Sequence, residues 1–164
     1  MARECRIITP KDELVVSDYA RILHKVIDEI SGFYEGTDII EKARQKYTPE
    51  YIQSHLMDPE IRFIGHFDDD TLDGILIEGF RSDSDEKKTG IYWVMADTKN
   101  KGIGTELITD CVSRARSEDK DVVILGVAAK NLKAIKLYER LGFIVGRVYN
   151  KNSIKMILMG SVIE

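Results

Sequence analysis

The sequence predicts an α+β fold with a mixed, mostly antiparallel central sheet that contains one parallel βαβ unit. The apolar residues recur at the helical period near the start of the chain and at the strand period in the middle. Later, two apolar strands flank an amphipathic helix, which predicts parallel strands joined by a right-handed crossover. The 164 residues are most simply one domain, residues 1–164, which is long enough to bury a core without disulfides or a metal.

The first third of the chain predicts one short strand followed by helices. Pro10 ends the strand, and Gly32 ends the long first helix. A weaker helical segment follows a loop at residues 33–38. Thr48 then has the character of an N-cap, with Pro49 at the first helical position. The expected bounds are Cys5–Thr9 for the strand, Lys11 to about Ile30 for the first helix, and Thr48 to about Leu56 for the last.

In the middle of the chain the pattern changes to strands with short connections. The connections are an acidic turn at residues 68–70 and a polar loop at residues 83–88, so the strands are expected to form an antiparallel meander. The expected strands are Ile61–Phe67, Leu72–Phe80 and Ile91–Ala96.

The last part of the chain supplies the parallel unit and a closing hairpin. The segment Val122–Val127 is almost entirely apolar, as expected of a strand that is covered on both faces. No internal repeat, linker or low-complexity segment interrupts the pattern. The expected elements are a helix from Gly104 to about Ser117, the strand Val122–Val127, a helix Leu132–Leu141 ended by Gly142, and strands Phe143–Tyr149 and Ile154–Met159.

The turn between the strand at Ala96 and the following helix predicts a phosphate-binding site. Gly102 and Gly104 stand where the turn becomes the helix, and glycine lets a ligand lie directly on the backbone. The first N–H groups of a helix lack partners within it and lie at the positive end of its dipole. A Walker loop is excluded because no lysine follows Gly104, and the dinucleotide fingerprint fails because Leu107 replaces its third glycine.

Composition narrows the function classes. Apolar residues make up 43% of the chain and charged residues 32%, as in a globular protein. The formal charge of −4 argues against non-specific nucleic-acid binding.

Cys111 falls on an apolar helix stripe and is expected to be a small buried hydrophobe. No signal-like or bilayer-spanning run occurs, which predicts a cytoplasmic protein without a membrane partner.

Two motifs in order and spacing connect the chain to a known family. They are Val94-x-Ala96-x-x-Lys99-x-x-Gly102-x-Gly104 and Asn131-x-x-Ala134-x-x-x-Tyr138-Glu139-Arg140-Leu141-Gly142-Phe143. Together they resemble the GNAT superfamily of acetyl-CoA-dependent N-acetyltransferases, whose turn reads Gln/Arg-x-x-Gly-x-Gly/Ala. The resemblance covers about Ile91 to Phe143. Lys99 stands where the family has Gln or Arg, and Ala96 stands where many members have Pro.

The resemblance implies a three-layer α/β/α fold in which the two parallel strands splay apart. It also implies transfer of an acetyl group from acetyl-CoA to a primary amine, by direct attack and without an acyl-enzyme or a metal. The diphosphate would lie on the turn, and the backbone of Val94–Ala96 would meet the thioester carbonyl. The implied cofactor-binding residues are Val94, Met95, Ala96, Lys99, Asn100, Lys101, Gly102, Ile103, Gly104, Thr105, Asn131, Ala134 and Tyr138.

Two residues of the second motif have a structural and a functional interpretation each. Asn131 is a good N-cap, and in the family pattern an Asn here lies beside the cofactor arm. Tyr138 lies on an apolar helix stripe, and the matching family position is often the acid that protonates the CoA thiolate. Lys130, Lys133 and Lys136 either meet cofactor phosphates or form a solvated helix face.

The general base has no single candidate in the sequence. Glu78 lies within an apolar strand and is either the base or part of an exposed strand face. Glu35, in the loop after the first helix, is a second candidate because family substrates enter near that loop. His66 is expected to be an ordinary residue near a strand end. No cluster of residues has metal-ligand spacing.

The acetyl acceptor remains open in the sequence. It is either a protein, through an N-terminal α-amine or a lysine, or a small amine. A different class of function is a non-catalytic acyl-CoA-binding module that acts in sensing or assembly. The chain is expected to be a monomer or a homodimer.

Overall fold

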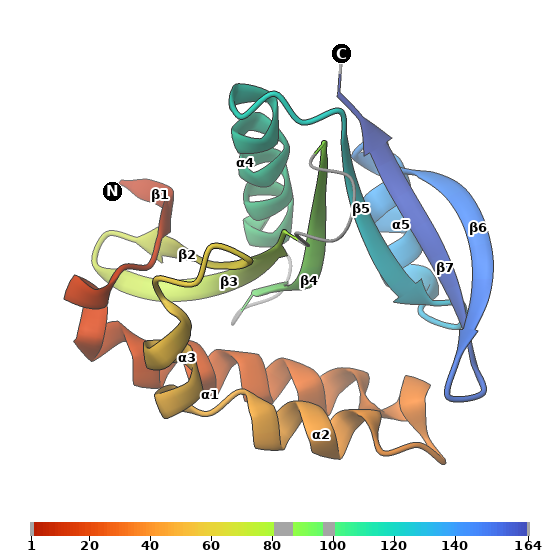
Figure 1. Cartoon of the computed structure of the whole chain (residues 1–164), viewed down its shortest axis with the longest axis horizontal. Helices are drawn as coiled ribbons and strands as arrows, with labels where there is room; N and C mark the ends of the chain where they lie inside the picture. The colour runs from red at the N-terminus through yellow and green to blue at the C-terminus, as the bar shows by residue number, and fades with distance from the viewer. Residues whose placement is uncertain (1, 81–86, 97–100, 164) are drawn as a thin grey trace.

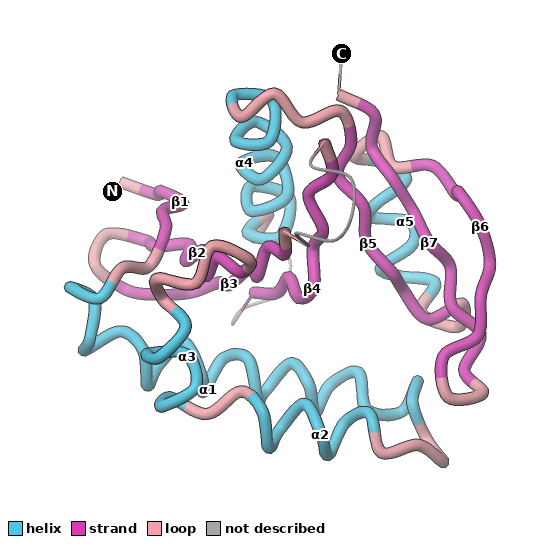
Figure 2. Tube along the Cα trace, viewed as in Figure 1, coloured by secondary structure: helices cyan, strands magenta, loops and turns pink. Residues whose placement is uncertain are grey.

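The computed structural model of the chain describes residues 2–80, 87–96 and 101–163 (Figure 1). The elements alternate much as the sequence predicts, and Figure 2 shows helices and strands in separate layers. The strands are β1 (Arg3–Ile7), β2 (Ile61–Asp68), β3 (Thr71–Gly79), β4 (Lys88–Ala96), β5 (Val122–Ala128), β6 (Ile144–Lys151) and β7 (Ile154–Val162). The helices are α1 (Glu13–Ile30), α2 (Ile39–Lys46), α3 (Pro49–His55), α4 (Ile103–Ser117) and α5 (Leu132–Arg140), with 3₁₀ turns at Pro10–Asp12 and Ser31–Tyr34.

The strands form one sheet in the order β1-β2-β3-β4-β5-β7-β6. Strands β2, β3 and β4 make the predicted antiparallel meander, and β4 and β5 make the predicted parallel pair around α4. Every other neighbouring pair is antiparallel. The predicted fold class, a mostly antiparallel mixed sheet with one parallel unit, is therefore confirmed.

Helices cover both faces of this sheet, which confirms the three-layer arrangement. Helices α1, α2 and α3 lie on one face, and α4 and α5 lie on the other (Figure 1). Each layer has its own apolar cluster, one centred on α1 and the inward side chains of β2 and β3, the other on α4, β5 and α5. No helix among the described residues is both long and apolar enough to cross a lipid bilayer.

The start of the chain differs from the prediction by a few residues. Strand β1 ends at Ile7, not at Thr9, because the Thr9 side chain caps the 3₁₀ turn at Pro10–Asp12. The backbone N–H of Thr9 donates to Asp12 Oδ2 at 2.8 Å, which completes a capping box. The predicted cap at Thr48 is confirmed, since its side chain accepts a hydrogen bond from Tyr51 N at 3.1 Å.

Strand β4 begins three residues earlier than predicted. The sequence places Lys88 in the predicted polar loop and assigns Thr89 and Gly90 to no strand, but the backbone of Lys88–Gly90 pairs with β5 from Val122 to Ile124. The neighbouring strand thus overrides the weak local strand propensity of this segment. This early start matters because it supplies most of the contact between the two parallel strands.

Candidate active site

The parallel strands β4 and β5 pair for only four residues and then separate. Residues Lys88–Ile91 lie opposite Val122–Leu125. Beyond Ile91, β4 continues to Ala96 with β3 as its neighbour, and β5 continues to Ala128 with β7 as its neighbour. Figure 1 shows the two strands diverging toward their carboxyl ends. The predicted splay is confirmed, and beyond Ile91 no strand among the described residues pairs with the edge of β4 that faces the gap.

A bulge in β4 lies where this separation begins. Glu78 of β3 pairs with Ile91 and Ile77 pairs with Trp93, so Tyr92 has no partner residue opposite it. The ring of Tyr92 lies against Gly79, where an added Cβ would stand 2.0 Å from Tyr92 Cζ. Bulges bend a strand and redirect its side chains. The bulge therefore contributes to turning the end of β4 away from β5.

The turn that follows β4 ends at a helix N-terminus with exposed backbone donors. Gly102 is the N-cap of α4 in the left-handed conformation (φ 74°), and it offers no side chain to cap the helix. Gly104 lies in the first turn, and an added Cβ there would meet only Leu137 Cδ2, at 3.8 Å. The N–H groups of Ile103, Gly104 and Thr105 precede the first intrahelical bond, which Glu106 N donates to Gly102 O at 3.0 Å. Lys99 and Asn100 lie outside the described residues.

Buried side chains fix α4 and so fix the direction of these donors. Ile103, Leu107 and Cys111 are each at most 2% exposed and pack toward the sheet. The prediction that Cys111 is a small buried hydrophobe is confirmed, and burial raises the pKa of its thiol far above the ordinary value. At the start of the helix, Arg3 Nη2 donates to the Lys101 carbonyl at 3.0 Å.

The second motif begins at the N-terminus of α5. Asn131 is the N-cap, and its Oδ1 accepts a hydrogen bond from Ala134 N at 3.3 Å. The capping interpretation of Asn131 is therefore confirmed. The lysines at 130, 133 and 136 have exposed side chains, as expected of a solvated helix face.

Tyr138 projects from α5 into the apolar layer that contains α4. Its ring centroid lies 6.0 Å from that of Phe143, at an interplanar angle of 52°. Burial, with a smaller contribution from Tyr34, raises the pKa of the Tyr138 hydroxyl to about 12. The hydroxyl is therefore protonated across the neutral range, as a proton donor must be.

Glu78 does not lie on an exposed strand face, so that part of the prediction is wrong. Its side chain is buried, and both carboxylate oxygens are occupied. Arg62 Nε donates to Oε2 at 2.9 Å, and Arg114 Nε donates to Oε1 at 2.9 Å. A carboxylate fully engaged by two guanidinium groups has no free lone pair directed at a substrate amine. The tentative role of Glu78 as general base is therefore not supported, and the structure gives it a structural role.

The ion pairs around Glu78 form a network across three elements. Arg62 also donates to both oxygens of Glu118, at 2.8 and 2.7 Å, and Arg114 also contacts Asp110. The Arg62 guanidinium holds the pKa of Glu118 below its usual range. The network joins β2 and β3 to the second half of α4.

His66 is also more than an ordinary strand residue, which corrects a second expectation. It is fully buried in β2, and its two ring nitrogens contact Asp73 of β3 and Glu106 of α4. The sequence pattern missed this group because its members lie 7 and 40 residues from His66. Glu35 has an exposed side chain directly after the 3₁₀ turn that contains Tyr34.

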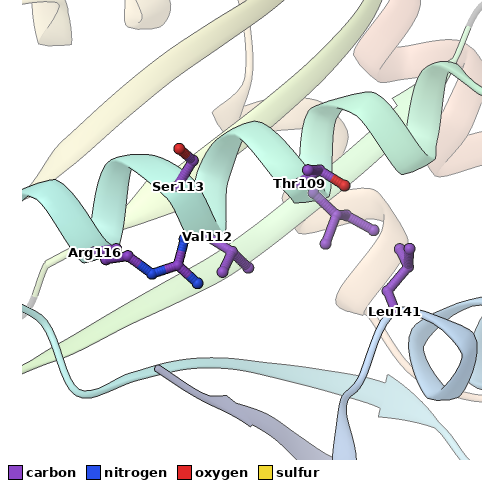
Figure 3. Close-up of a pocket in the computed structure, with 6 residues that line it drawn as sticks. Thr109, Val112, Ser113, Arg116 and Leu141 are labelled. Atoms are coloured by element: carbon purple, nitrogen blue, oxygen red, sulfur yellow. The ribbon is translucent and has the colours of Figure 1, made fainter. Parts of the chain in front are cut away.

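A separate shallow pocket of about 260 Å³ lies between α4 and the end of α5 (Figure 3). Figure 3 shows Thr109, Val112 and Ser113 on α4 and Leu141 across from them. None of the predicted site residues lines it, and Val112 is about 12 Å along the helix from Gly104. Within the described residues, no group of three or more His, Cys, Asp or Glu side chains is placed to hold a metal ion.

Comparisons with known proteins agree with this geometry. The sequence model of the acetyltransferase (GNAT) family matches residues 23–143. An L-methionine sulfoximine/L-methionine sulfone acetyltransferase of Pseudomonas paraeruginosa is 32% identical over 66 residues, which are 40% of this chain and 36% of the relative. The chain thus matches about a third of the length of this curated relative.

Solved structures share the fold over nearly the whole chain. The PaiA N-acetyltransferase of Thermoplasma acidophilum, in complex with coenzyme A, has a TM-score of 0.76 at 22% identity and covers 99% of both chains. The ribosomal-protein-S18-alanine N-acetyltransferase of Escherichia coli has a TM-score of 0.68 at 14% identity, over 99% of this chain and 94% of the other. At these identities the likeness establishes the fold.

The buried network makes a prediction about stability. Replacing Glu78 with Gln removes the buried charge that two partly buried guanidinium groups share, so the free energy of unfolding should fall by about 3–5 kcal/mol. Asp18→Asn is the matched control, because the Asp18–Arg21 pair is exposed and should contribute about 1 kcal/mol or less. Urea denaturation followed by circular dichroism measures both. Equal midpoints for the two variants would contradict the structural role of Glu78.

Proposed function

Because the chain belongs to the acetyltransferase (GNAT) family, we propose that it transfers an acetyl group from acetyl-CoA to a primary amine. The reaction proceeds by direct attack of the neutral amine on the thioester, with both substrates bound. The observation that carries the proposal is the exposed helix N-terminus at Gly102–Thr105 beside the open edge of β4. The first feature suits a diphosphate and the second suits the pantetheine arm and its thioester.

The turn before α4 supports binding of the CoA diphosphate. Three backbone N–H groups at Ile103, Gly104 and Thr105 lie at the positive end of the helix dipole. No side chain of Gly102 or Gly104 covers them. Lys101 adds a positive charge beside the turn, and Lys99 and Asn100, outside the described residues, remain predicted contacts.

The open edge of β4 supports the placement of the thioester. Residues Trp93–Ala96 pair with β3 on one edge, while the other edge faces the gap toward β5. Backbone groups at Val94–Ala96 can therefore bond to the pantetheine amides. An N–H directed at the thioester oxygen would stabilise the negative charge that develops there during attack. Asn131 and Ala134, at the start of α5, remain predicted contacts of the cofactor.

Tyr138 is the proposed proton donor to the departing thiolate. A complete transfer from a phenol of pKa about 12 to a thiolate of pKa about 8.5 is uphill by roughly 5 kcal/mol. The hydroxyl therefore acts first as a hydrogen-bond donor to the sulfur and gives up its proton as the C–S bond breaks. The nitrogen of the tetrahedral intermediate releases the proton that, through water, restores the phenol.

The identity of the acceptor depends on how its amine loses a proton. A lysine-type amine of pKa about 10.4 costs roughly 4–5 kcal/mol to deprotonate at pH 7, against about 1 kcal/mol for an α-amine. Because Glu78 is engaged by two arginines, an α-amine suits this site better than a lysine. Glu35 is the proposed base for a more basic acceptor, since it follows Tyr34, a neighbour of Tyr138. The two relatives' names support either size of acceptor, one an amino-acid derivative and one a ribosomal protein.

The first prediction of this function concerns the turn. In Gly104→Val the added Cβ meets only Leu137 Cδ2, at 3.8 Å, so the fold should keep its stability. The side chain would cover the backbone donors, and CoA binding should weaken by about 10- to 100-fold through the loss of one or two charge-assisted hydrogen bonds. Isothermal titration calorimetry with CoA measures the effect. Ser117→Val, about 20 Å along the same helix, is the control, and equal weakening in both variants would refute the site.

The second prediction separates an enzyme from a binding protein. Tyr138→Phe should lower kcat by about 10²- to 10³-fold and leave the CoA dissociation constant nearly unchanged. Since the pKa of Tyr138 is raised to about 12, its ionisation should not reduce the rate of the parent enzyme until above about pH 10. Tyr51→Phe, on α3, should keep the parent rate. A Tyr138→Phe enzyme with the parent kcat would exclude this residue as the acid.

The third prediction concerns the acceptor. Acetyl-CoA consumption should be fastest at pH 7 with peptides or amino acids that carry a free α-amine, and slower with polyamines or peptides whose only amine is a lysine. Glu35→Gln should change the α-amine rate by less than about tenfold, because that amine needs little help from a base. A loss of more than that would assign Glu35 as an obligatory base. Tight CoA binding with no acceptor turned over would favour a non-catalytic acyl-CoA-binding module instead.

A further inference from the structure

The Tyr149 side chain of β6 reaches across β7 to the place where β4 and β5 separate. The last pair between the two parallel strands is Ile91 and Leu125, so Gly126 is the first residue of β5 beyond that pairing. A Cβ added to Gly126 would clash with the Tyr149 hydroxyl and would lie 3.9 Å from Met156 Cε of β7. The missing side chain at Gly126 therefore makes room for this hydroxyl at the edge of the gap.

The Tyr149 hydroxyl lies on the side of the sheet that α1 covers. Leu125 and Val127 of β5 pack in the cluster around α4 and α5, so Gly126 between them faces the other side. Tyr34, in the 3₁₀ turn after α1, packs in the α1 cluster on that same side. Burial, with a smaller contribution from Tyr149, raises the pKa of the Tyr34 hydroxyl, which places the two phenols near each other.

Tyr34 also lies near Tyr138, the proposed proton donor, although the two belong to opposite sides of the sheet. Tyr138 packs in the cluster around α4 and α5, and Tyr34 contributes to the raised pKa of its hydroxyl after the larger effect of burial. Side chains from the two layers can meet where the sheet is open, and the gap beyond Ile91 is such an opening. The three phenols therefore form a row that leads from the proposed place of the thioester sulfur to β6.

Arg147 adds a positive charge at the β6 end of this row. It lies two residues from Tyr149 on the same strand, so both side chains project on the same side of the sheet. The Arg147 Cζ lies 5.5 Å from the centroid of the Tyr149 ring. Its side chain is exposed, and within the described part of the chain it forms no ion pair. A guanidinium group and two phenol hydroxyls supply the donors that a carboxylate accepts.

Charges of opposite sign flank the row of phenols. Glu35 has an exposed side chain directly after Tyr34, while Arg147 lies beside Tyr149. Among the described residues these two charged side chains do not pair with each other. A small zwitterion carries the complementary charges, which are an ammonium group and a carboxylate.

We propose that Arg147, Tyr149 and Tyr34 bind a carboxylate of the acceptor, which is an amino acid or a short peptide rather than a protein. The amine of this molecule attacks the thioester near Tyr138, while its carboxylate lies toward β6. A protein N-terminus continues as a chain where such a molecule ends in its carboxylate, so it would leave the Arg147 guanidinium without an anion. The proposal rests on the proposed function, because it names the substrate class of the same site.

The test compares acceptors that differ only in the charge of the carboxyl end. Amino acids, dipeptides and tripeptides are each offered as the free acid and as the C-terminal amide, and kcat and KM are measured for each. The three lengths place the carboxylate at increasing distances from the amine, by about 3.5 Å per residue. The variants are Arg147→Gln and Tyr149→Phe. Arg116→Gln, an exposed arginine at the end of α4, is the matched control.

The parent enzyme should prefer the free acid at one of these lengths. Arg147→Gln should lower kcat/KM for that acid by about 10- to 100-fold, mainly through KM, because a charge-assisted hydrogen bond is lost. The same variant should leave the rate with the matching amide within about twofold of the parent rate, since the amide has no charge to lose. Tyr149→Phe should give a smaller loss with the acid, of about threefold to tenfold. Arg116→Gln should alter neither rate, and the CoA dissociation constant should stay the same in all variants.

The outcomes separate this proposal from the proposed function. An Arg147→Gln enzyme that loses equally with acids and amides, or loses with neither, would overturn the carboxylate site. Acetylation of peptide amides and protein N-termini without any preference for free acids would overturn it as well and leave the proposed function intact.

If the parent protein acetylates no amine, the proposed function is refuted, and calorimetry still decides the carboxylate site. In that case the acid and the amide are titrated into the CoA-bound protein. Tighter binding of the acid in the parent but not in Arg147→Gln would support the site, and equal binding of both compounds would overturn it.

Discussion

The short pairing of β4 with β5 is the constraint on which the rest of the structure depends. Four residue pairs hold the strands together at Lys88–Ile91, and a bulge at Tyr92 follows at once. Beyond it, β4 pairs with β3 and β5 pairs with β7, so each strand keeps a neighbour although the two no longer pair with each other. The sheet therefore keeps its core intact, and within the described residues one backbone edge of β4 has no strand partner beyond Ile91. A sheet paired to the end of both strands would leave no place for an extended ligand.

Helix α4 carries the other half of the proposed cofactor site, and two groups of charges hold it against the sheet. Arg114, in its second half, binds the buried Glu78, and Glu106, in its first turn, contacts the buried His66. Buried ion pairs contribute little net stability on average, but removing one partner is costly and the required geometry is narrow. In this protein, the main effect of these two groups of charges is to fix the position of α4 on the sheet. Apolar packing by Ile103, Leu107 and Cys111 tolerates small shifts, whereas charged hydrogen bonds at both ends fix the rotation and depth of the helix.

Among the described residues, one side chain is a clear candidate for the acid that protonates the departing thiolate. No described side chain is an equally clear candidate for the base that deprotonates the amine. Tyr138 is partly buried, protonated and placed on α5 beside α4, while both carboxylate oxygens of Glu78 are bonded to arginines. An enzyme of this kind suits an amine that is partly neutral at the working pH, because the main barrier is then attack and expulsion of the thiolate. The proposed preference for α-amines is a direct consequence of where one glutamate pairs.

The sequence by itself determined the features that depend on local periodicity and on backbone chemistry. The order of strands and helices, the caps at Thr48 and Asn131, the glycines of the turn and the parallel unit all follow from residues close together in the chain. Only the tertiary structure decided what the isolated polar residues do. Glu78 meets Arg114 across 36 positions and His66 meets Glu106 across 40, so no local pattern distinguishes a paired buried charge from an exposed one. The start of β4 at Lys88 was likewise decided by a neighbouring strand, because hydrogen bonding to β5 outweighs the weak strand propensity of Lys88–Gly90.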